Sequence, residues 1–347
     1  MPAVIKTMNK LIHEIPEHLP APSQAPGGWP RADRIPLYNP IRAEVGIPFI
    51  VETGHECFNP SIFRHNGRLI MAWREKFYSA VIWIGELGAD YQLISKRKLS
   101  LSQWIRNPNA AFEDPRLFHL NGKLYINCIL VIGQYITVGL IEMSDELRAV
   151  NMKVFNDDGS RQEKNWQFFN NNDQMFGIYS VNPHAVGRLT EDRFSVSDSS
   201  PQLHWMEGEA RGGTPPVRIG DEYFSFFHSS YRKNYVCGFY AFEAKFPFRI
   251  TRWPKDPCLV ATRPDWRLIG PSVVFPCGAI CEEGIWTVSF GWHDDHCCLG
   301  QWRHSDLLSN LSPADTCKSS SIQKPVIKNF KVVDSLKLNC FFDKFPG

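Results

Sequence analysis

The sequence lacks any hydrophobic run long enough to cross a membrane. No stretch of its 347 residues approaches the roughly 18 consecutive apolar residues of a membrane-spanning helix. Its start, residues 1–7, lacks the apolar core of a secretory signal peptide. These absences predict a cytoplasmic protein without a membrane span.

Excess charge of one sign is also lacking. The formal net charge is +2, and no sustained Lys/Arg stripe runs along the chain. Nucleic-acid binding depends largely on such a basic field, so the sequence predicts no nucleic-acid partner.

The ten cysteines lack the paired spacing of a zinc site. Without a secretory signal they are expected to be buried free thiols rather than disulfides. The run from His293 to His296 contains metal-competent side chains, but consecutive residues of a strand point to opposite faces. The sequence therefore predicts no metal site, and nothing in it calls for a cofactor.

A short pattern returns five times along the chain. Each copy has a Pro or aromatic residue, an apolar pair, a polar or Gly turn, and then an alternating apolar run. The copies start at positions 60, 115, 168, 215 and 276, so the spacings are 55, 53, 47 and 61 residues. A period of about 50 residues with one hairpin in each copy is typical of propeller blades.

The turns of the repeats support this interpretation. The pairs Asn66-Gly67, Asn121-Gly122 and Glu283-Gly284 adopt positive φ at little cost, as two-residue hairpin turns require. Each copy then supplies the inner strands of a four-stranded blade. The sequence predicts an all-β chain folded as a five-bladed β-propeller, and the alternative is a sandwich of unrelated hairpins.

The repeat also suggests the domain organisation. Residues 46–305 are expected to form the propeller that carries the site. Residues 1–45 are rich in proline and predict an extended arm. Residues 306–347 predict an extension that packs on the propeller or closes it, with a strand or two within 326–342.

The densest polar run at an inner-strand start is Glu113-Asp114-Pro115-Arg116. In a propeller the start of each innermost strand faces the central channel, so this run is expected near the axis. Strand alternation would place Asp114 and Arg116 on one face and Glu113 on the other. Taken alone, the run is equally typical of a structural salt bridge at a strand start.

This run resembles the EDPR motif of glycoside hydrolase family 130, whose five-bladed propellers include β-mannoside phosphorylases and hydrolases. Three further stretches follow in the order of that family: Lys164-Asn165, then residues 212–216 with 226–228, then residues 289–294. The resemblance spans roughly residues 50–300 and touches four of the five repeats.

The resemblance implies that Asp114 is the general acid that protonates the glycosidic oxygen, directly or through a hydroxyl of the sugar. A neighbouring cation favours the charged carboxylate, which works against this role, so Arg116 is expected to pair with Glu113 or the substrate instead. Trp73, Trp166 and Trp292 are candidate faces for sugar stacking. The expected substrate-binding residues are Asn59, Arg74, Glu75, Glu113, Arg116, Lys164, Asn165, Asn182, His184, Arg211, Thr214, His228, Trp292 and Asp294.

Two positions depart from the phosphorylase pattern. Asn182 falls where the family has an Arg that holds phosphate, and Arg211 falls where it has a Lys. A hydrolase would instead need a second carboxylate as base, about 6.5–9.5 Å from the acid for inversion. Glu207, Glu209 and Asp295 are the candidates for that base.

The sequence therefore predicts an enzyme that makes or breaks a β-glycosidic bond with inversion, with mannose-type sugars as the first choice. A glycosyltransferase is slightly favoured over a phosphorylase, because the departures disturb the expected phosphate site. A hydrolase and a sugar-binding propeller without activity are the alternatives. The expected partner is a sugar or oligosaccharide, or an activated sugar such as a sugar 1-phosphate or a nucleotide sugar, for which Arg161, Lys164 and Arg211 are the available cations.

Overall fold

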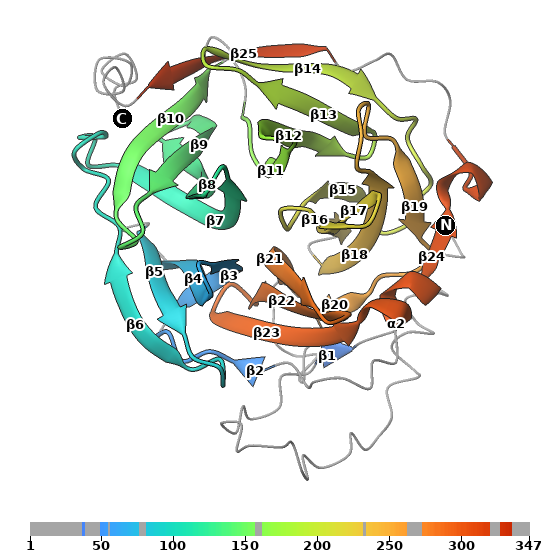
Figure 1. The fold of residues 1–347 in the computed structure, drawn as a ribbon, viewed down its shortest axis with the longest axis horizontal. Coiled ribbons are helices and arrows are strands. Elements are labelled where there is room, and N and C mark those ends of the chain that lie inside the picture. The colour runs from blue at the N-terminus through green and yellow to red at the C-terminus, as the bar shows by residue number, and fades with distance from the viewer. Residues whose placement is uncertain are drawn as a thin grey trace.

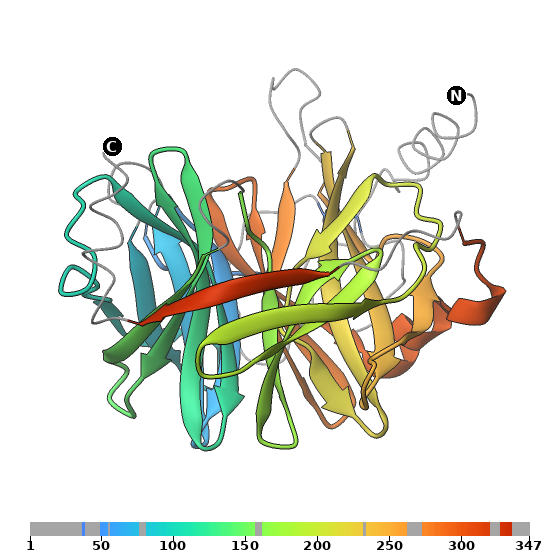
Figure 2. The same ribbon diagram turned by 90° about the horizontal axis from the view of Figure 1, so that it is seen from above.

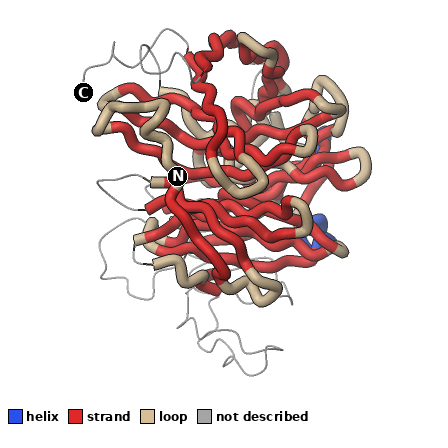
Figure 3. Tube along the Cα trace, turned by 60° about the vertical axis from the view of Figure 1, so that its left-hand side comes forward, coloured by secondary structure: helices blue, strands red, loops and turns tan. Residues whose placement is uncertain are grey.

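The protein is a five-bladed β-propeller, in which antiparallel sheets surround one central axis (Figure 1). The computed structural model describes residues 37–38, 49–54, 56–75, 81–156, 162–231, 234–261, 273–319 and 327–334. Strands make up most of this part of the chain, and loops join them at the blade ends (Figure 3). In the same ranges, helical structure is limited to α2 (His304–Ser309) and the 3-10 turn η1 (Ala314–Thr316). No described helix is long and apolar enough to cross a bilayer.

Blades 1 to 3 each consist of four strands that pair in chain order. Blade 1 contains β3 (Cys57–His65), β4 (Arg68–Glu75), β5 (Ile82–Leu87) and β6 (Leu93–Lys98). Blade 2 contains β7 (Ala110–Leu120), β8 (Lys123–Ile132), β9 (Tyr135–Met143) and β10 (Ala149–Asn156). Blade 3 contains β11 (Gln167–Asn171), β12 (Gln174–Val181), β13 (His184–Leu189) and β14 (Arg193–Ser199).

Blades 4 and 5 depart from this simple order. In blade 4 the inner edge is divided between two short strands, and the outer edge likewise. Its strands are β15 (Glu209–Gly212), β16 (Val217–Ile219), β17 (Glu222–Tyr231), β18 (Asn234–Glu243), β19 (Ile250–Pro254) and β20 (Leu259–Ala261). Blade 5 contains β21 (Val274–Glu282), β22 (Ile285–Trp292) and β23 (His296–Arg303).

Segments before and after the repeats complete the ring. The strand β2 (Phe49–Ile50) pairs with β23 and becomes the fourth strand of blade 5, so the start of the propeller is joined to its last blade. The strand β25 (Lys328–Asp334) pairs with both β10 and β14 and links the outer edges of blades 2 and 3, as Figure 2 shows. These pairings cover edges that would otherwise be open to aggregation.

Two further short strands lie in the terminal segments that the sequence set apart from the repeats. The strand β1 (Leu37–Tyr38) pairs with β20, and β24 (Leu311–Pro313) pairs with β19. The rest of the proline-rich arm up to residue 45, and residues 335–347, fall outside the described residues, as does Arg161.

The hairpin turns have the geometry that the sequence predicts. Asn66 and Gly67 have φ of 50° and 76°, and the φ values of the corresponding residue pairs after β7 and β21 are also positive. In blade 3 the positive φ values fall on Asn172 and Asp173, and in blade 4 Gly220 has φ of 62°. Asn, Asp and Gly tolerate this region best, which explains why they recur at these positions.

Two inner strands carry a β-bulge at the same place. The register of β3 shifts between Phe58 and Ser61, and that of β7 shifts between Glu113 and Arg116. Within the bulges Asn59 and Asp114 have φ of 52° and 50°, and each precedes a proline that has no N–H for the ladder. A bulge re-aims a side chain, so the two bulges turn equivalent positions of blades 1 and 2 in the same way.

Aromatic side chains fill the spaces between blades. Phe169 of blade 3 packs against Tyr223 and Phe242 of blade 4, with ring centroids 4.9 and 5.9 Å apart. Trp73 and Trp166 are 0% and 1% exposed, so both belong to the core and neither offers a face to a sugar.

Candidate active site

A cavity of about 510 Å³ lies where the inner strands of the blades meet, and residues of all five blades line it. Its volume falls within the range of small-molecule sites. The cavity brings together nine of the residues that the sequence singled out, namely Asn59, Arg74, Glu113, Asp114, Lys164, Asn165, Arg211, His228 and Asp294.

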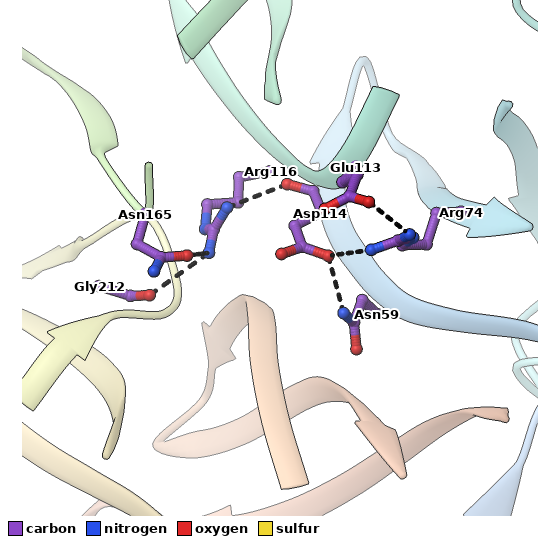
Figure 4. A network of polar contacts seen from close by, with 7 residues as sticks. All are labelled: Asn59, Arg74, Glu113, Asp114, Arg116, Asn165 and Gly212. Carbon is purple, nitrogen blue, oxygen red and sulfur yellow. Dashed lines mark hydrogen bonds and ion pairs between the residues drawn. The ribbon is translucent and has the colours of Figure 1, made fainter. Parts of the chain in front are cut away.

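Asp114 lies at the centre of a polar network at one wall of the cavity (Figure 4). Its Oδ1 atom accepts hydrogen bonds from Asn59 Nδ2 at 2.8 Å and from Arg74 Nη1 at 3.3 Å. The Nη2 atom of the same arginine donates to Glu113 Oε1 at 2.8 Å. One guanidinium thus holds both carboxylates, with Asp114 only 7% exposed.

The two oxygens of Asp114 have different surroundings. Both hydrogen bonds from Asn59 and Arg74 end on Oδ1, and no side chain or backbone group of the described chain is hydrogen-bonded to Oδ2. In Figure 4 the second oxygen points away from Arg74 and toward the side of Asn165 and Gly212. The carboxyl group is therefore held at one oxygen, while the other is available to a ligand.

Arg74 is a cation in this network. Burial lowers the pKa of Arg74, but the coulombic and hydrogen-bond contacts with Asp114 and Glu113 outweigh it and the net shift is upward. Its guanidinium also lies over the Phe58 ring, 4.7 Å from the centroid.

Arg116 takes a different position from the one that the motif suggested. It is fully buried and does not bond the Glu113 side chain. Its nitrogens donate to the backbone oxygens of Gly213 at 2.7 Å, Asp114 at 3.0 Å and Gly212 at 3.3 Å, and to Asn165 Oδ1 at 3.3 Å. Arg116 therefore connects β7 of blade 2 to the end of β15 in blade 4.

Cationic groups gather on another part of the wall. Lys164 and Arg211 both line the cavity, and both act electrostatically on His228. The Nη2 and Nε atoms of Arg211 donate to Glu209 Oε2 at 2.7 and 3.1 Å, and the Glu209 side chain is 69% exposed. An exposed pair of this kind is weak, so a better anion can replace Glu209 as the partner of Arg211.

His228 lies between these cations and two aromatic rings. Its ring stacks on Tyr235 at 5.8 Å and contacts Phe275 at 4.2 Å. Burial, together with Arg116 and Arg211, holds the pKa of His228 well below its usual value, so the ring is neutral near pH 7. Its Nδ1 atom is buried and has no hydrogen-bond partner among the described residues.

Three predicted residues lie near the cavity but do not line it. Glu75 is the last residue of β4 and accepts from Trp83 Nε1 at 3.0 Å. Thr214 is fully buried, and its Oγ1 atom accepts the Phe226 amide at 3.0 Å. Trp292 stacks on His296 at 5.5 Å, although Asp294 two residues later reaches the cavity.

Two predicted residues of blade 3 lie further away. Asn182 follows β12, the second strand of the blade, and its side chain makes two 2.8 Å hydrogen bonds with the backbone of Leu203. His184 begins β13 and packs against Tyr240 and Phe242, and burial lowers its pKa to about 3. Asn182 lies in the turn after the second strand and His184 begins the third strand of the blade, so both are displaced outward from the inner strand β11.

None of the three candidate bases lines the cavity. Glu207 is buried, and this burial, together with the negative charge of Asp256, raises its pKa. Glu209 pairs with Arg211, and Asp295 lies beside His296. The carboxylates that line the cavity are Glu113, Asp114 and Asp294. Within the described ranges, no group of three or more His, Cys, Asp or Glu side chains is placed to hold a metal ion.

Several lining residues carry no signal in the sequence. Tyr235 lies on β18 rather than on an inner strand, Phe58 precedes Asn59, and Val273 lies just before β21. Tyr235 stacks on His228 and Phe58 lies under Arg74, contacts that only the folded chain reveals.

No protein-family model matches the chain. A β-1,2-mannobiose phosphorylase of Thermoanaerobacter sp. (strain X514) is 31% identical over 101 residues, which are 28% of this chain and 33% of that protein. The chain therefore matches about a third of the length of this curated relative.

Solved structures of carbohydrate-active propellers are similar over most of the chain. A member of glycoside hydrolase family 130, in a study of hydrolases that target β-1,2 mannosidic linkages in Candida mannan, superposes with a TM-score of 0.58 at 13% identity and covers 78% of this chain and 94% of that one. A glycosyl hydrolase of Bacteroides ovatus gives 0.55 at 12% identity over 84% of this chain and 96% of its own. These similarities establish the fold. The resemblance to glycoside hydrolase family 130 that the sequence motifs indicate therefore includes the fold.

Proposed function

We propose that this protein is an inverting β-glycoside phosphorylase acting on mannose-type sugars. It would cleave a β-linked sugar with inorganic phosphate and, in reverse, join a sugar 1-phosphate to an acceptor sugar. The observation that carries the proposal is one cavity that contains both the available Asp114 Oδ2 atom and the cations Lys164 and Arg211.

Asp114 supplies the general acid. Its proton passes to the glycosidic oxygen, directly or through a substrate hydroxyl, as the bond from that oxygen to the anomeric carbon breaks. A phosphate oxygen forms the new bond to the anomeric carbon from the opposite face. The products are an α-configured sugar 1-phosphate and an acceptor sugar that carries the proton.

The contacts of Asp114 also bear on the direction of the reaction. Asn59 and Arg74 hold its Oδ1 atom and leave Oδ2 toward the cavity. In the synthetic direction the Asp114 carboxylate removes a proton from the acceptor hydroxyl as that oxygen attacks the sugar 1-phosphate. The same carboxyl group can therefore serve cleavage and synthesis.

Lys164 and Arg211 supply the anion site. In the sequence, an Asn at position 182 argued against a phosphate site. Asn182, however, lies outside the candidate active site, and its side chain bonds the Leu203 backbone. The remaining departure is Arg211, which keeps the positive charge and adds a guanidinium suited to phosphate. Phosphorolysis therefore replaces transfer from a nucleotide sugar as the first choice.

Product analysis tests the proposal. β-Linked mannobioses are incubated with and without phosphate, and α-mannose 1-phosphate and a nucleotide sugar are offered with a mannose acceptor. Proton NMR of the first product is expected to show phosphate-dependent α-mannose 1-phosphate from the mannobiose. Transfer only from the nucleotide sugar would make the protein a glycosyltransferase, and phosphate-independent free mannose would make it a hydrolase. Binding without turnover would make it a sugar-binding propeller.

A further inference from the structure

A second cavity, of about 670 Å³, lies beside the candidate active site. It forms where the segment that joins blades 3 and 4 meets the chain after η1. The Leu203 and Ser319 backbones form an antiparallel bridge there, and the His204 amide donates to the Lys318 oxygen at 2.9 Å. Its wall thus combines two segments that are more than a hundred residues apart in sequence.

The two cavities share an ion pair. Glu209 lines the second cavity and Arg211 lines the candidate active site, and both side chains extend from the same face of β15. The 2.7 Å contact between them therefore lies at the boundary between the cavities. A ligand that binds Arg211 in the candidate active site can therefore extend into the second cavity.

The lining of the second cavity suits a neutral polar ligand with apolar faces. Trp205 is half-buried and fixed by a 2.9 Å hydrogen bond from its Nε1 atom to Ser229 Oγ, and Met206 beside it is 41% exposed. The charged residues of the lining are Glu209 and Lys318, one of each sign. Sugar rings combine apolar faces with hydroxyl rims, and aromatic side chains bind the former.

We infer that the second cavity binds further sugar units of an oligosaccharide whose reacting linkage lies in the candidate active site. This inference rests on the proposed function. The balanced charge of the lining favours sugar units over the nucleoside diphosphate of an activated sugar, which would bring two phosphate charges next to Glu209. The protein would then prefer β-linked chains of three or more units to disaccharides.

Kinetics across chain length test the inference. kcat/KM is measured with phosphate on β-linked mannose di-, tri- and tetrasaccharides for the wild type, Met206→Ala and Lys318→Ala. Both changed side chains are exposed, whereas Trp205→Ala would also remove packing against Trp253. Ile94→Ala, at an exposed position on β6 of blade 1, is the matched control.

The wild type should prefer the trisaccharide, and each variant should lower kcat/KM on the trisaccharide roughly three- to tenfold more than on the disaccharide. Equal wild-type values for both lengths, or losses in the variants that are the same at every length, would overturn the inference while leaving the proposed function intact.

Absence of turnover on every glycoside would instead contradict the proposed function. Ligand-observed NMR on the Asp114→Asn protein then decides the second cavity. Trisaccharide binding that Met206→Ala weakens supports the inference. Binding of a nucleoside diphosphate that Lys318→Ala weakens, without trisaccharide binding, refutes it.

Discussion

Asn59 and Asp114 hold equivalent positions in blades 1 and 2, and the Asn59 Nδ2 atom donates to Asp114 Oδ1 over 2.8 Å. Each residue lies in a bulge with φ near 50° and precedes a proline. The repeated bulge thus turns two side chains of adjacent blades toward each other. Blade 1 thereby supplies the group that orients the proposed acid of blade 2.

Replacement of Asp114 should separate catalysis from stability. Asp114→Asn preserves the shape of the side chain but removes the transferable proton, so turnover on an unactivated β-mannoside should fall about 10²–10⁴-fold. The melting temperature should change little, because Asn can still accept the hydrogen bond from Asn59. Steady-state kinetics and thermal unfolding check both values. An unfolded variant would assign the Glu113-Asp114-Arg74 network a structural role instead.

Gly291 should matter to activity through Asn59. A Cβ atom at position 291 would lie 1.9 Å from Asn59 Oδ1 and 2.9 Å from the Asn59 backbone nitrogen. Gly291→Ala should therefore displace Asn59 and misplace Asp114, with a loss of about 10²-fold in kcat. Gly88→Ala is the control, because the nearest atom to its Cβ belongs to the movable, exposed side chain of Asp90. Equal activity of the two variants would show that the contact between Asn59 and Asp114 is dispensable.

Phosphate affinity should depend on the cationic wall. Lys164→Ala and Arg211→Ala each remove a charge-assisted contact to a dianion, so the KM for phosphate should rise roughly ten- to hundredfold. Arg218→Ala is the matched control, because Arg218 is exposed on blade 4, donates to the Gly220 backbone oxygen and does not line the cavity. Initial rates over a phosphate series measure the effect. An unchanged KM in both variants would place the anion elsewhere.

Two buried histidines should make the protein sensitive to acid. His184 and His228 have folded-state pKa values below the ordinary value of about 6.5, to about 3 for His184, and burial is the main cause in both. Below that ordinary value the unfolded chain binds protons that the folded chain does not, so the free energy of unfolding falls as the pH falls. Each histidine contributes a slope of at most about 1.4 kcal/mol per pH unit.

Denaturant unfolding between pH 4 and 8 measures this slope. His184→Phe retains an aromatic ring among Tyr240 and Phe242 and should flatten the pH dependence. A pH dependence that is the same in wild type and His184→Phe would contradict the prediction.

The architecture could be predicted from the sequence because it depends on patterns within short stretches of the chain. Asn-Gly and Glu-Gly turns permit the positive φ of two-residue hairpins, and alternating apolar runs pair across them. The spacing of these hairpins predicts five blades, and the Glu113-Asp114-Pro115-Arg116 run at an inner-strand start marks the wall of the cavity.

Only the tertiary structure decided which side chains reach the cavity. Asn182 and His184 match positions in the repeat but lie after the second strand and at the start of the third strand of blade 3, and the Thr214 hydroxyl accepts a hydrogen bond from the Phe226 amide. Because a bulge or a slip of one residue turns a strand side chain to the opposite face, spacing alone cannot assign such positions. The closure of the ring by β2, the backbone contacts of Arg116 and the cavity lined by Trp205 likewise join residues distant in sequence, so they follow from packing rather than from any local pattern.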